Sequence, residues 1–221
     1  MHRQYSAVLF DLDGTLLDTL VDLATAANRA LAALELPVHP VDSYRYFVGD
    51  GLHVLMERIL PPGQVFGART TELTKIFQQE YARNWNNQTK PYPGVPAMLD
   101  ALSGLGMPMS ILSNKPEDFT RLCVEQLLPR WTFSPLYGQR PGVPKKPDPA
   151  AAHAIARFLQ LPPATVLYVG DTAVDMQTAK AAGMDAVGVL WGFRTPDELK
   201  QAGARYLITQ PDELMQIIRG C

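Results

Sequence analysis

Two aspartates, Asp11 and Asp13, stand directly after the apolar run Ala7-Val8-Leu9-Phe10 and before Gly14. The run has the length and composition of a buried β-strand. Residues i and i+2 of a strand point to the same side, so we expect both carboxylates to project together from its carboxyl end. Two neighbouring anions need a cation or a shared proton between them. The spacing therefore indicates a bound metal, acid–base chemistry, or both.

The Asp-x-Asp-Gly pattern also occurs in calcium loops and ordinary turns. Here no glutamate closes a calcium loop and an apolar strand precedes the pair, which favours a site at the strand end. The stretch Asp11-Leu12-Asp13-Gly14-Thr15-Leu16 resembles the first motif of the haloacid dehalogenase-like hydrolases. This resemblance implies that Asp11 attacks phosphorus and that Asp13 acts as the general acid and base.

A second candidate group, Ser113-Asn114-Lys115, follows an expected strand from Met109 to Leu112. A hydroxyl and the backbone N–H groups after it can donate to a phosphoryl oxygen. A helix N-cap at this turn is an equally good interpretation. In register with the first motif, the group resembles the second motif of the family. The resemblance implies that Ser113 binds phosphate, and we predict that Asn114 belongs to the same site.

A third group is Lys145-Lys146-Pro147-Asp148-Pro149. A cation beside Asp11 would offset the repulsion between an anionic nucleophile and an anionic phosphate. The alternative is a solvated lysine ahead of a proline-led helix start. The group resembles the third motif of the phosphoglycolate phosphatase-like branch. That resemblance implies that Lys146, directly before the proline, binds phosphate, while Lys145 stays open as the local alternative.

The fourth group, Gly170-Asp171-Thr172-Ala173-Val174-Asp175, follows an expected strand from Val166 to Val169 and resembles the fourth motif. Mg²⁺ prefers a few carboxylates together with waters and phosphate oxygens. We predict a Mg²⁺ site made by Asp11, the backbone carbonyl of Asp13, and Asp171, with Asp175 reaching the metal or its water. A helix N-terminal carboxylate is the alternative for Asp175.

These residues need a sheet whose strand ends meet at one edge. From Pro91 onward, expected helices and strands alternate, as is typical of a parallel sheet. Between residues 19 and 90 the pattern predicts helices at about 18–36, 41–47, 52–60 and 70–85 and no strand. We predict an α/β protein with a Rossmann-like core, residues 1–18 and 91–221, and an inserted helical cap domain, residues 19–90. The alternative for the insert is additional helices covering the sheet.

Composition excludes several other classes of protein. The net charge is −2, which provides no basic excess for a nucleic-acid partner. No apolar run approaches the roughly 18 residues that a membrane span requires. Cys123 and Cys221 are far apart in sequence, which suggests a reducing compartment rather than a disulfide framework. We therefore expect a cytoplasmic protein.

The resemblance implies a Mg²⁺-dependent phosphomonoesterase that acts on a small phosphorylated metabolite through an aspartyl-phosphate. Gly49-Asp50-Gly51, in the insert, resembles the cap loop of phosphoglycolate phosphatases, and we expect it to influence substrate choice. Phosphoglycolate is our first choice of substrate. Two alternatives remain open: a sugar-phosphate mutase of the same superfamily, similar to β-phosphoglucomutase, and a non-catalytic phosphate-binding regulatory protein.

Overall fold

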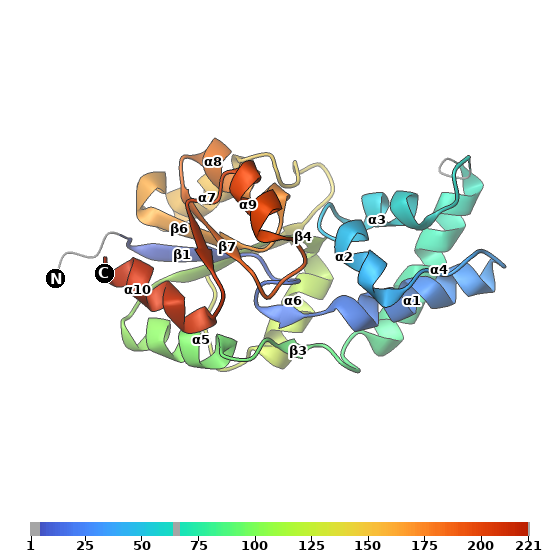
Figure 1. The fold of residues 1–221 in the computed structure, drawn as a ribbon, viewed down its shortest axis with the longest axis horizontal. Coiled ribbons are helices and arrows are strands. Elements are labelled where there is room, and N and C mark those ends of the chain that lie inside the picture. Colours follow the sequence, from blue (N-terminus) through green and yellow to red (C-terminus); the bar gives the residue numbers. More distant parts are fainter. Residues whose placement is uncertain (1–4, 64–66, 221) are drawn as a thin grey trace. The chain divides into compact units, whose positions relative to one another are not determined.

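The computed structural model describes residues 5–63 and 67–220 of the 221-residue chain. Within these residues, six strands form a parallel sheet in the order β5-β4-β1-β6-β7-β8 (Figure 1). The first strand, which ends at Phe10 directly before Asp11, is central and pairs with β4 and β6. The predicted Rossmann-like α/β core is confirmed. The strands are β1 (Ala7–Phe10), β4 (Met109–Pro116), β5 (Leu136–Gln139), β6 (Val166–Gly170), β7 (Asp185–Val189) and β8 (Tyr206–Ile208).

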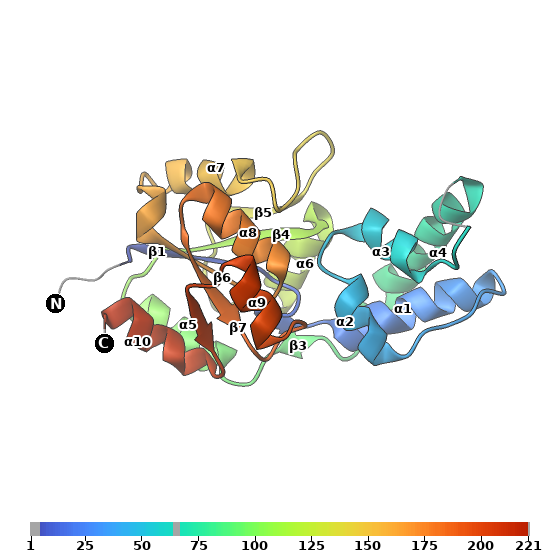
Figure 2. The same ribbon diagram turned by 45° about the horizontal axis from the view of Figure 1, so that its top comes forward.

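Helices cover both faces of this sheet. On one face, Leu9 and Tyr168 of the sheet share a core with Ile155, Met176 and Leu199 of α7, α8 and α9. Figures 1 and 2 show α5 and α10 on the opposite side. A sheet buried on both faces explains why β1 and β6 are continuous apolar runs. The core helices are α5 (Val95–Gly104), α6 (Glu117–Leu127), α7 (Ala150–Phe158), α8 (Ala173–Ala182), α9 (Pro196–Ala202) and α10 (Leu214–Arg219), with 3₁₀ turns η2 (Pro163–Thr165) and η3 (Pro211–Glu213).

The described chain separates into two compact units. The sheet unit contains the described residues up to Leu17 and from Pro91 onward, and the second unit is the segment Asp18–Lys90. The second unit is helical, and its α1 packs against α4. Buried residues on both helices recur at helical spacing, which explains why the sequence pattern predicts these helices. The elements of this unit are α1 (Leu20–Ala33), η1 (Val41–Ser43), α2 (Tyr44–Phe47), α3 (Leu52–Ile59) and α4 (Ala68–Asn84).

The expectation of no strand in residues 19–90 is wrong at one position. Lys90 begins β3 (Lys90–Pro91), which pairs with β2 (Leu17–Asp18) in a separate two-stranded sheet of the described chain. Two-residue strands are too short to show alternation, so no sequence pattern could predict them. These strands lie where the chain leaves the sheet unit and where it returns.

Two further differences concern the sheet unit. β4 continues to Pro116 instead of ending at Leu112, so the second motif lies inside a strand. The helices α9 and α10 were not predicted, because each is shorter than two full turns of clear periodicity.

Cys123 is buried on α6, and Cys221 lies outside the described residues. Among the described helices, none combines the length and the apolar character needed to cross a bilayer.

Candidate active site

Asp11 lies at the carboxyl end of β1, in the middle of the sheet. Its backbone N–H donates to the carbonyl of Val169 on β6 at 2.9 Å, which continues the strand pairing. Its side chain is buried, and Oδ1 accepts from the backbone N–H of Leu12 at 2.7 Å. The same oxygen lies 2.9 Å from Nζ of Lys146. A buried carboxylate is thus held in one orientation by a backbone donor and a cation.

Lys146 is the buried cation of this group, with 2% of its side chain exposed. Besides Asp11, its ammonium group donates to Oδ1 of Asp175 at 2.7 Å and to the carbonyl of Leu112 at 3.0 Å. Burial alone would lower the pKa of Lys146, but Asp11 and Asp175 raise it well above its ordinary value. Of the two lysines considered from the sequence, Lys146 therefore reaches Asp11 as a permanent cation.

Asp171 lies just past the end of β6, packed against two glycines. Oδ1 accepts from the hydroxyl of Thr15 at 3.0 Å, and Oδ2 accepts from the backbone N–H of Phe193 at 2.9 Å. A Cβ added at Gly14 or at Gly192 would overlap the Asp171 side chain. Gly14 also has φ +84°, a conformation that favours glycine. Both glycines are therefore needed for the carboxylate to reach this position.

Asp175 lies on the first turn of α8 and is fully buried. Oδ2 accepts from the backbone N–H and the hydroxyl of Thr172, which closes a capping box at the start of the helix. Oδ1 accepts from Lys146 and, at 3.4 Å, from the hydroxyl of Tyr168. A Cβ at Gly170 would overlap Asp175, which explains the glycine that ends β6. Asp175 thus combines a helix-capping role with a contact to the site cation.

The second motif connects β4 to the loop that carries Lys146. The amide of Asn114 donates to the carbonyl of Lys146 at 3.1 Å, and its Oδ1 accepts from the backbone N–H of Lys146 at 2.9 Å. This pair of hydrogen bonds fixes the backbone from which the Lys146 side chain projects. Ser113 is buried at the end of β4, where its Oγ accepts from the backbone N–H of Lys115 at 3.2 Å. Phosphate binding by Ser113 and Asn114 stays a prediction.

The buried charges do not balance within this group. Asp11, Asp171 and Asp175 form one buried cluster of three carboxylates, and Lys146 pairs with two of them, Asp11 and Asp175. Burial and the nearby Asp175 raise the pKa of Asp11 to about 7. Burial and the same neighbour raise the pKa of Asp171 well above its ordinary value. The folded protein therefore disfavours this much negative charge, and a further cation would relieve the repulsion.

The three carboxylates fit a hard divalent cation. Each offers one oxygen, and these oxygens all lie within 4.8 Å of one another. Carboxylate oxygens are the ligands that such cations prefer, with waters and substrate oxygens filling the remaining positions. The donor set, its burial and its excess negative charge point to the same kind of ion.

A family model described as haloacid dehalogenase-like hydrolase matches residues 8–189, which include all four motifs. The chain belongs to the haloacid dehalogenase-like hydrolases. This confirms the family predicted from the sequence. Hydrolases of this family that act as phosphatases use a divalent metal, in agreement with the carboxylate cluster.

Individual relatives in this hydrolase family are similar over nearly the whole chain. A phosphoglycolate phosphatase of Pseudomonas savastanoi pv. phaseolicola is 34% identical over 97% of this chain and 79% of its own length. The Escherichia coli phosphoglycolate phosphatase is 33% identical over 96% of this chain and 88% of its own. A crystal structure from Lactobacillus delbrueckii subsp. bulgaricus has a TM-score of 0.90 at 28% identity, covering 97% of this chain and 98% of that one. The match therefore extends through the insert as well as the sheet unit.

The loop predicted to choose the substrate of this hydrolase lies in the second unit. Gly49 and Gly51 have φ of +123° and +88°, so both positions favour glycine. Oδ2 of Asp50 pairs with a guanidinium nitrogen of Arg58 on α3 at 2.6 Å. Arg58 also donates to the carbonyls of Tyr46 and Phe47. The loop is thus tied to the helix that follows it, and its role in specificity stays a prediction.

Several site residues of the hydrolase were not predicted individually. Thr15 and the backbone of Phe193 donate hydrogen bonds to Asp171, and the hydroxyl of Tyr168 donates to Asp175. A single hydroxyl residue or a backbone N–H group has no distinctive pattern in one sequence, so these contacts could not be predicted. Lys115 belongs to the second motif, and the structure places its ammonium group against Asp13. It lies beyond the predicted strand 109–112 and inside the longer β4, so the sequence pattern does not show that it is buried.

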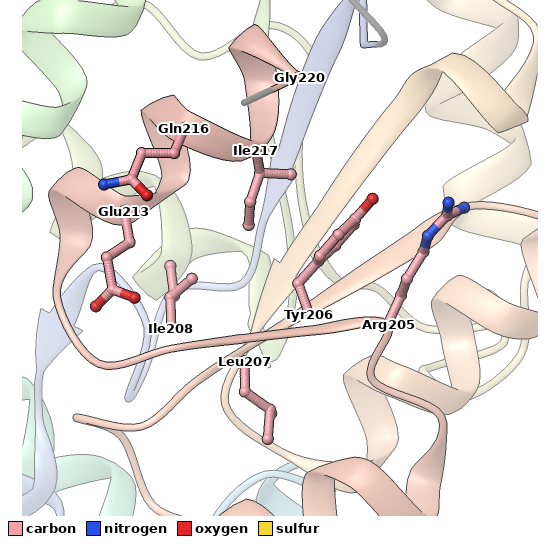
Figure 3. A pocket seen from close by; sticks show the side chains of 8 residues that line it. All are labelled: Arg205, Tyr206, Leu207, Ile208, Glu213, Gln216, Ile217 and Gly220. Atoms are coloured by element: carbon pink, nitrogen blue, oxygen red, sulfur yellow. The ribbon is translucent and has the colours of Figure 1, made fainter.

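A separate hollow of about 510 Å³ lies at the edge of the sheet, between β8 and α10 (Figure 3). Its charged side chains are already paired. Arg205 donates to Asp185 at 2.7 Å, and Glu213 accepts from Thr209 and Gln210. None of the four motif groups lines this hollow. The lining residues are Arg205, Tyr206, Leu207, Ile208, Glu213, Gln216, Ile217 and Gly220.

Proposed function

We propose that this chain is a phosphomonoesterase of the phosphoglycolate phosphatase type. The observation that carries the proposal is the contact of Asp11 with Lys146 at 2.9 Å, next to a carboxylate cluster that fits a divalent cation. A nucleophilic carboxylate needs a fixed orientation and a cation that allows an anionic phosphate to approach it. The names of the relatives support the same activity.

The reaction proceeds in two halves, formation of the aspartyl-phosphate and its hydrolysis. In the first, an oxygen of Asp11 attacks phosphorus, and the bond from phosphorus to the leaving oxygen breaks with its electron pair. Asp13 gives the leaving alkoxide a proton. In the second half, Asp13 takes a proton from water, whose oxygen attacks phosphorus and displaces the Asp11 carboxylate. Lys146, Ser113 and backbone N–H groups after Asp11 stabilise the phosphoryl oxygens in both halves.

Asp11, Asp171 and the backbone carbonyl of Asp13 would hold Mg²⁺. We assign Asp175 to a metal-bound water, because each of its oxygens already accepts two hydrogen bonds from protein groups, whereas each oxygen of Asp171 accepts one. When bound, Mg²⁺ neutralises phosphate charge and helps to align the phosphoryl group with the nucleophile. Burial, and then repulsion from Asp175, raise the pKa of both Asp11 and Asp171, and a bound cation would make it less costly to keep these carboxylates ionised.

Phosphoglycolate is the substrate that we propose, because it is the substrate named in the relatives. We assign the second unit, Asp18–Lys90, to the cap predicted at residues 19–90, and we propose that it selects the leaving group. The motif residues contact groups common to any phosphate monoester, so discrimination needs another part of the chain. A cytoplasmic location, and the absence of nucleic-acid or membrane partners, stay predictions from composition.

The test is release of inorganic phosphate from a panel of small monoesters, measured with Mg²⁺ and with EDTA. Wild type should release phosphate with Mg²⁺ alone, and Asp11→Asn should lose at least about 10³-fold in kcat. The exposed Asp118 on α6 provides the matched control, Asp118→Asn. Equal phosphate release by wild type and Asp11→Asn would contradict the covalent mechanism. Sugar-phosphate isomerisation without net phosphate release would favour a mutase instead.

The environment of Asp11 determines how the activity of Asp11→Asn can be interpreted. The folded protein holds the Asp11 anion at a cost, shown by a pKa raised to about 7 through burial and Asp175. Asparagine has the same shape as aspartate, and Lys146 keeps its contact with Asp175, so Asp11→Asn should fold, which thermal unfolding of the variant checks. Lost turnover in a stable variant then reports on the nucleophile. Mass spectrometry after a rapid acid quench should find the phosphoryl adduct on Asp11 in wild type only.

A further inference from the structure

Lys115 is a buried lysine that the proposed chemistry does not yet use. Only 4% of its side chain is exposed, and Nζ lies 3.1 Å from both carboxylate oxygens of Asp13, whose side chain is 13% exposed. Burying an ammonium group is costly unless an anion accompanies it. The contact with Asp13 therefore compensates for the burial of Lys115.

The backbone of Lys115 is fixed on both sides. Its N–H donates to Oγ of Ser113 at 3.2 Å, and its carbonyl accepts from the hydroxyl of Thr120 on α6 at 3.1 Å. The residue belongs to β4, which pairs directly with β1. A lysine on a rigid strand end can place its ammonium group more reproducibly than one on a loop.

The geometry of the contact restricts Asp13. Nζ of Lys115 lies at the same distance from both Asp13 oxygens, so it faces the end of the carboxyl group rather than one of its sides. This contact holds the carboxyl group in one place and keeps its Cβ–Cγ bond pointing in one direction. A general acid must hold its proton within hydrogen-bond reach of the leaving oxygen, so a fixed position affects the rate of transfer.

We infer that Lys115 is a positioning residue that holds the Asp13 carboxyl group in the orientation needed for proton transfer. This inference rests on the proposed function, in which Asp13 protonates the leaving alkoxide and later deprotonates water. Lys115 forms and breaks no covalent bond in either half. Its effect should therefore appear only in steps that move a proton through Asp13.

Two substrates separate those steps. An alkyl phosphate releases an alkoxide, which needs a proton from Asp13 as the bond to phosphorus breaks. Nitrophenyl phosphate releases nitrophenolate, which is stable without a proton. Formation of the aspartyl-phosphate from nitrophenyl phosphate should thus be independent of Lys115, whereas its hydrolysis needs Asp13 as a base.

The experiment compares Lys115→Met with wild type at saturating Mg²⁺. We expect kcat for the alkyl phosphate to fall by about 10- to 100-fold with little change in KM. With nitrophenyl phosphate, rapid mixing should show a burst of one nitrophenolate per active site followed by slow steady turnover. Lys115→Arg, which keeps a cation at the position, should recover part of the loss. The exposed Lys180 on α8 gives the matched control, Lys180→Met, with unchanged kinetics.

A double-mutant comparison connects the effect to Asp13. In the Asp13→Asn background, adding Lys115→Met should change kcat by less than about 3-fold, because the group that Lys115 positions is already gone. Two full, additive losses would show that Lys115 acts elsewhere. Thermal unfolding of each variant identifies any loss that comes from misfolding, and Lys115→Arg supplies a second test if Lys115→Met does not fold.

Several outcomes overturn this inference while the proposed function survives. One is a wild-type kcat for Lys115→Met when Asp13→Asn is impaired. Another is a loss confined to KM for substrates that carry a carboxylate, which would assign Lys115 to substrate binding. A full-speed Asp13→Asn, or a wild type that releases no phosphate, would instead remove the proposed function itself.

Discussion

Lys146 approaches Oδ1 of Asp175 at 2.7 Å, slightly closer than its 2.9 Å contact with Oδ1 of Asp11. The ammonium group thus connects the candidate nucleophile to a carboxylate on the first turn of α8. That carboxylate also caps the helix through Thr172. The orientation of the site cation and the start of α8 therefore depend on the same side chain.

Asp175→Asn should reduce both activity and stability. An amide leaves Lys146 with one buried anion fewer, and breaking a buried ion pair from one side costs about 3 kcal/mol. We expect the free energy of unfolding, measured by urea denaturation, to fall by roughly this amount. The kcat should also fall, because Lys146 loses one of the contacts that aim it at Asp11. Unchanged stability together with a large loss of Mg²⁺ affinity would indicate that Asp175 is mainly a metal ligand.

Asp171→Asn should act on metal binding first. The two oxygens of Asp171 accept hydrogen bonds from the hydroxyl of Thr15 and the backbone N–H of Phe193. Neither of these bonds involves Lys146. We expect the apparent affinity for Mg²⁺, measured from the Mg²⁺ dependence of phosphate release, to weaken by at least about 10-fold. The exposed Asp197 on α9 provides the control Asp197→Asn. An unchanged Mg²⁺ dependence would remove Asp171 from the metal site.

The choice of ion gives a second measurement on the same site. Chelation with EDTA should abolish turnover, and added Mg²⁺ should restore it. Ca²⁺ should restore it poorly, because its larger and more variable coordination shell misplaces phosphorus relative to Asp11. Calorimetric titration of the metal-free protein checks binding apart from turnover. Full activity in chelator, with no metal carried through purification, would contradict the metal assignment.

A third prediction concerns Asp22, a buried carboxylate on α1. It accepts from the backbone N–H groups of Gln88 and Thr89 and from the hydroxyl of Thr89. Asp22→Ala leaves these donors without their acceptor, at a cost of about 1–3 kcal/mol per unsatisfied buried group. We expect the free energy of unfolding to fall by about 3 kcal/mol. The exposed Glu72 on α4 gives the control Glu72→Ala, which should change stability by less than about 0.5 kcal/mol.

The sequence was sufficient for features that depend on local pattern. The buried strand before Asp11, the alternation after Pro91 and the helical insert each follow from periodicity. Family resemblance then ordered the four motifs along the sheet edge. The family resemblance favours Lys146 over Lys145 because Lys146 directly precedes the proline. In the structure the side chain of Lys146 is buried and contacts Asp11. Lys146 lies between a carboxylate at the end of β1 and another on the first turn of α8.

Features that depend on three-dimensional packing could not be predicted from one sequence. The contact of Lys115 with Asp13 joins residues 102 positions apart, and the bond from Thr15 to Asp171 joins residues 156 apart. Gly192 is needed only because the Asp171 side chain packs against it. Such requirements arise when separate strands meet at one edge, and no local periodicity records them.

The last prediction concerns Asp50 and Arg58, which form an ion pair of 2.6 Å in the insert. Arg58 also donates to the carbonyls of Tyr46 and Phe47, so it fixes the backbone that leads into the Gly49-Asp50-Gly51 loop. If the conformation of this loop selects the leaving group, removing either partner should have the same result. We expect Asp50→Ala and Arg58→Ala to change the ratios of kcat/KM among monoesters by at least about 5-fold, in the same direction.

The double variant distinguishes a shared loop conformation from two separate effects. Residues that act through one ion pair are non-additive, so the double variant should match the single variants in its substrate preference. Mg²⁺ affinity should stay unchanged in all three, because the metal ligands belong to the sheet unit. Arg83 on α4, which pairs with Glu80 at 3.5 Å and is exposed, provides the control Arg83→Ala. A uniform fall in kcat/KM across all substrates, or no change, would show that this loop does not select the leaving group. Other parts of residues 18–90 would then have to provide the selectivity.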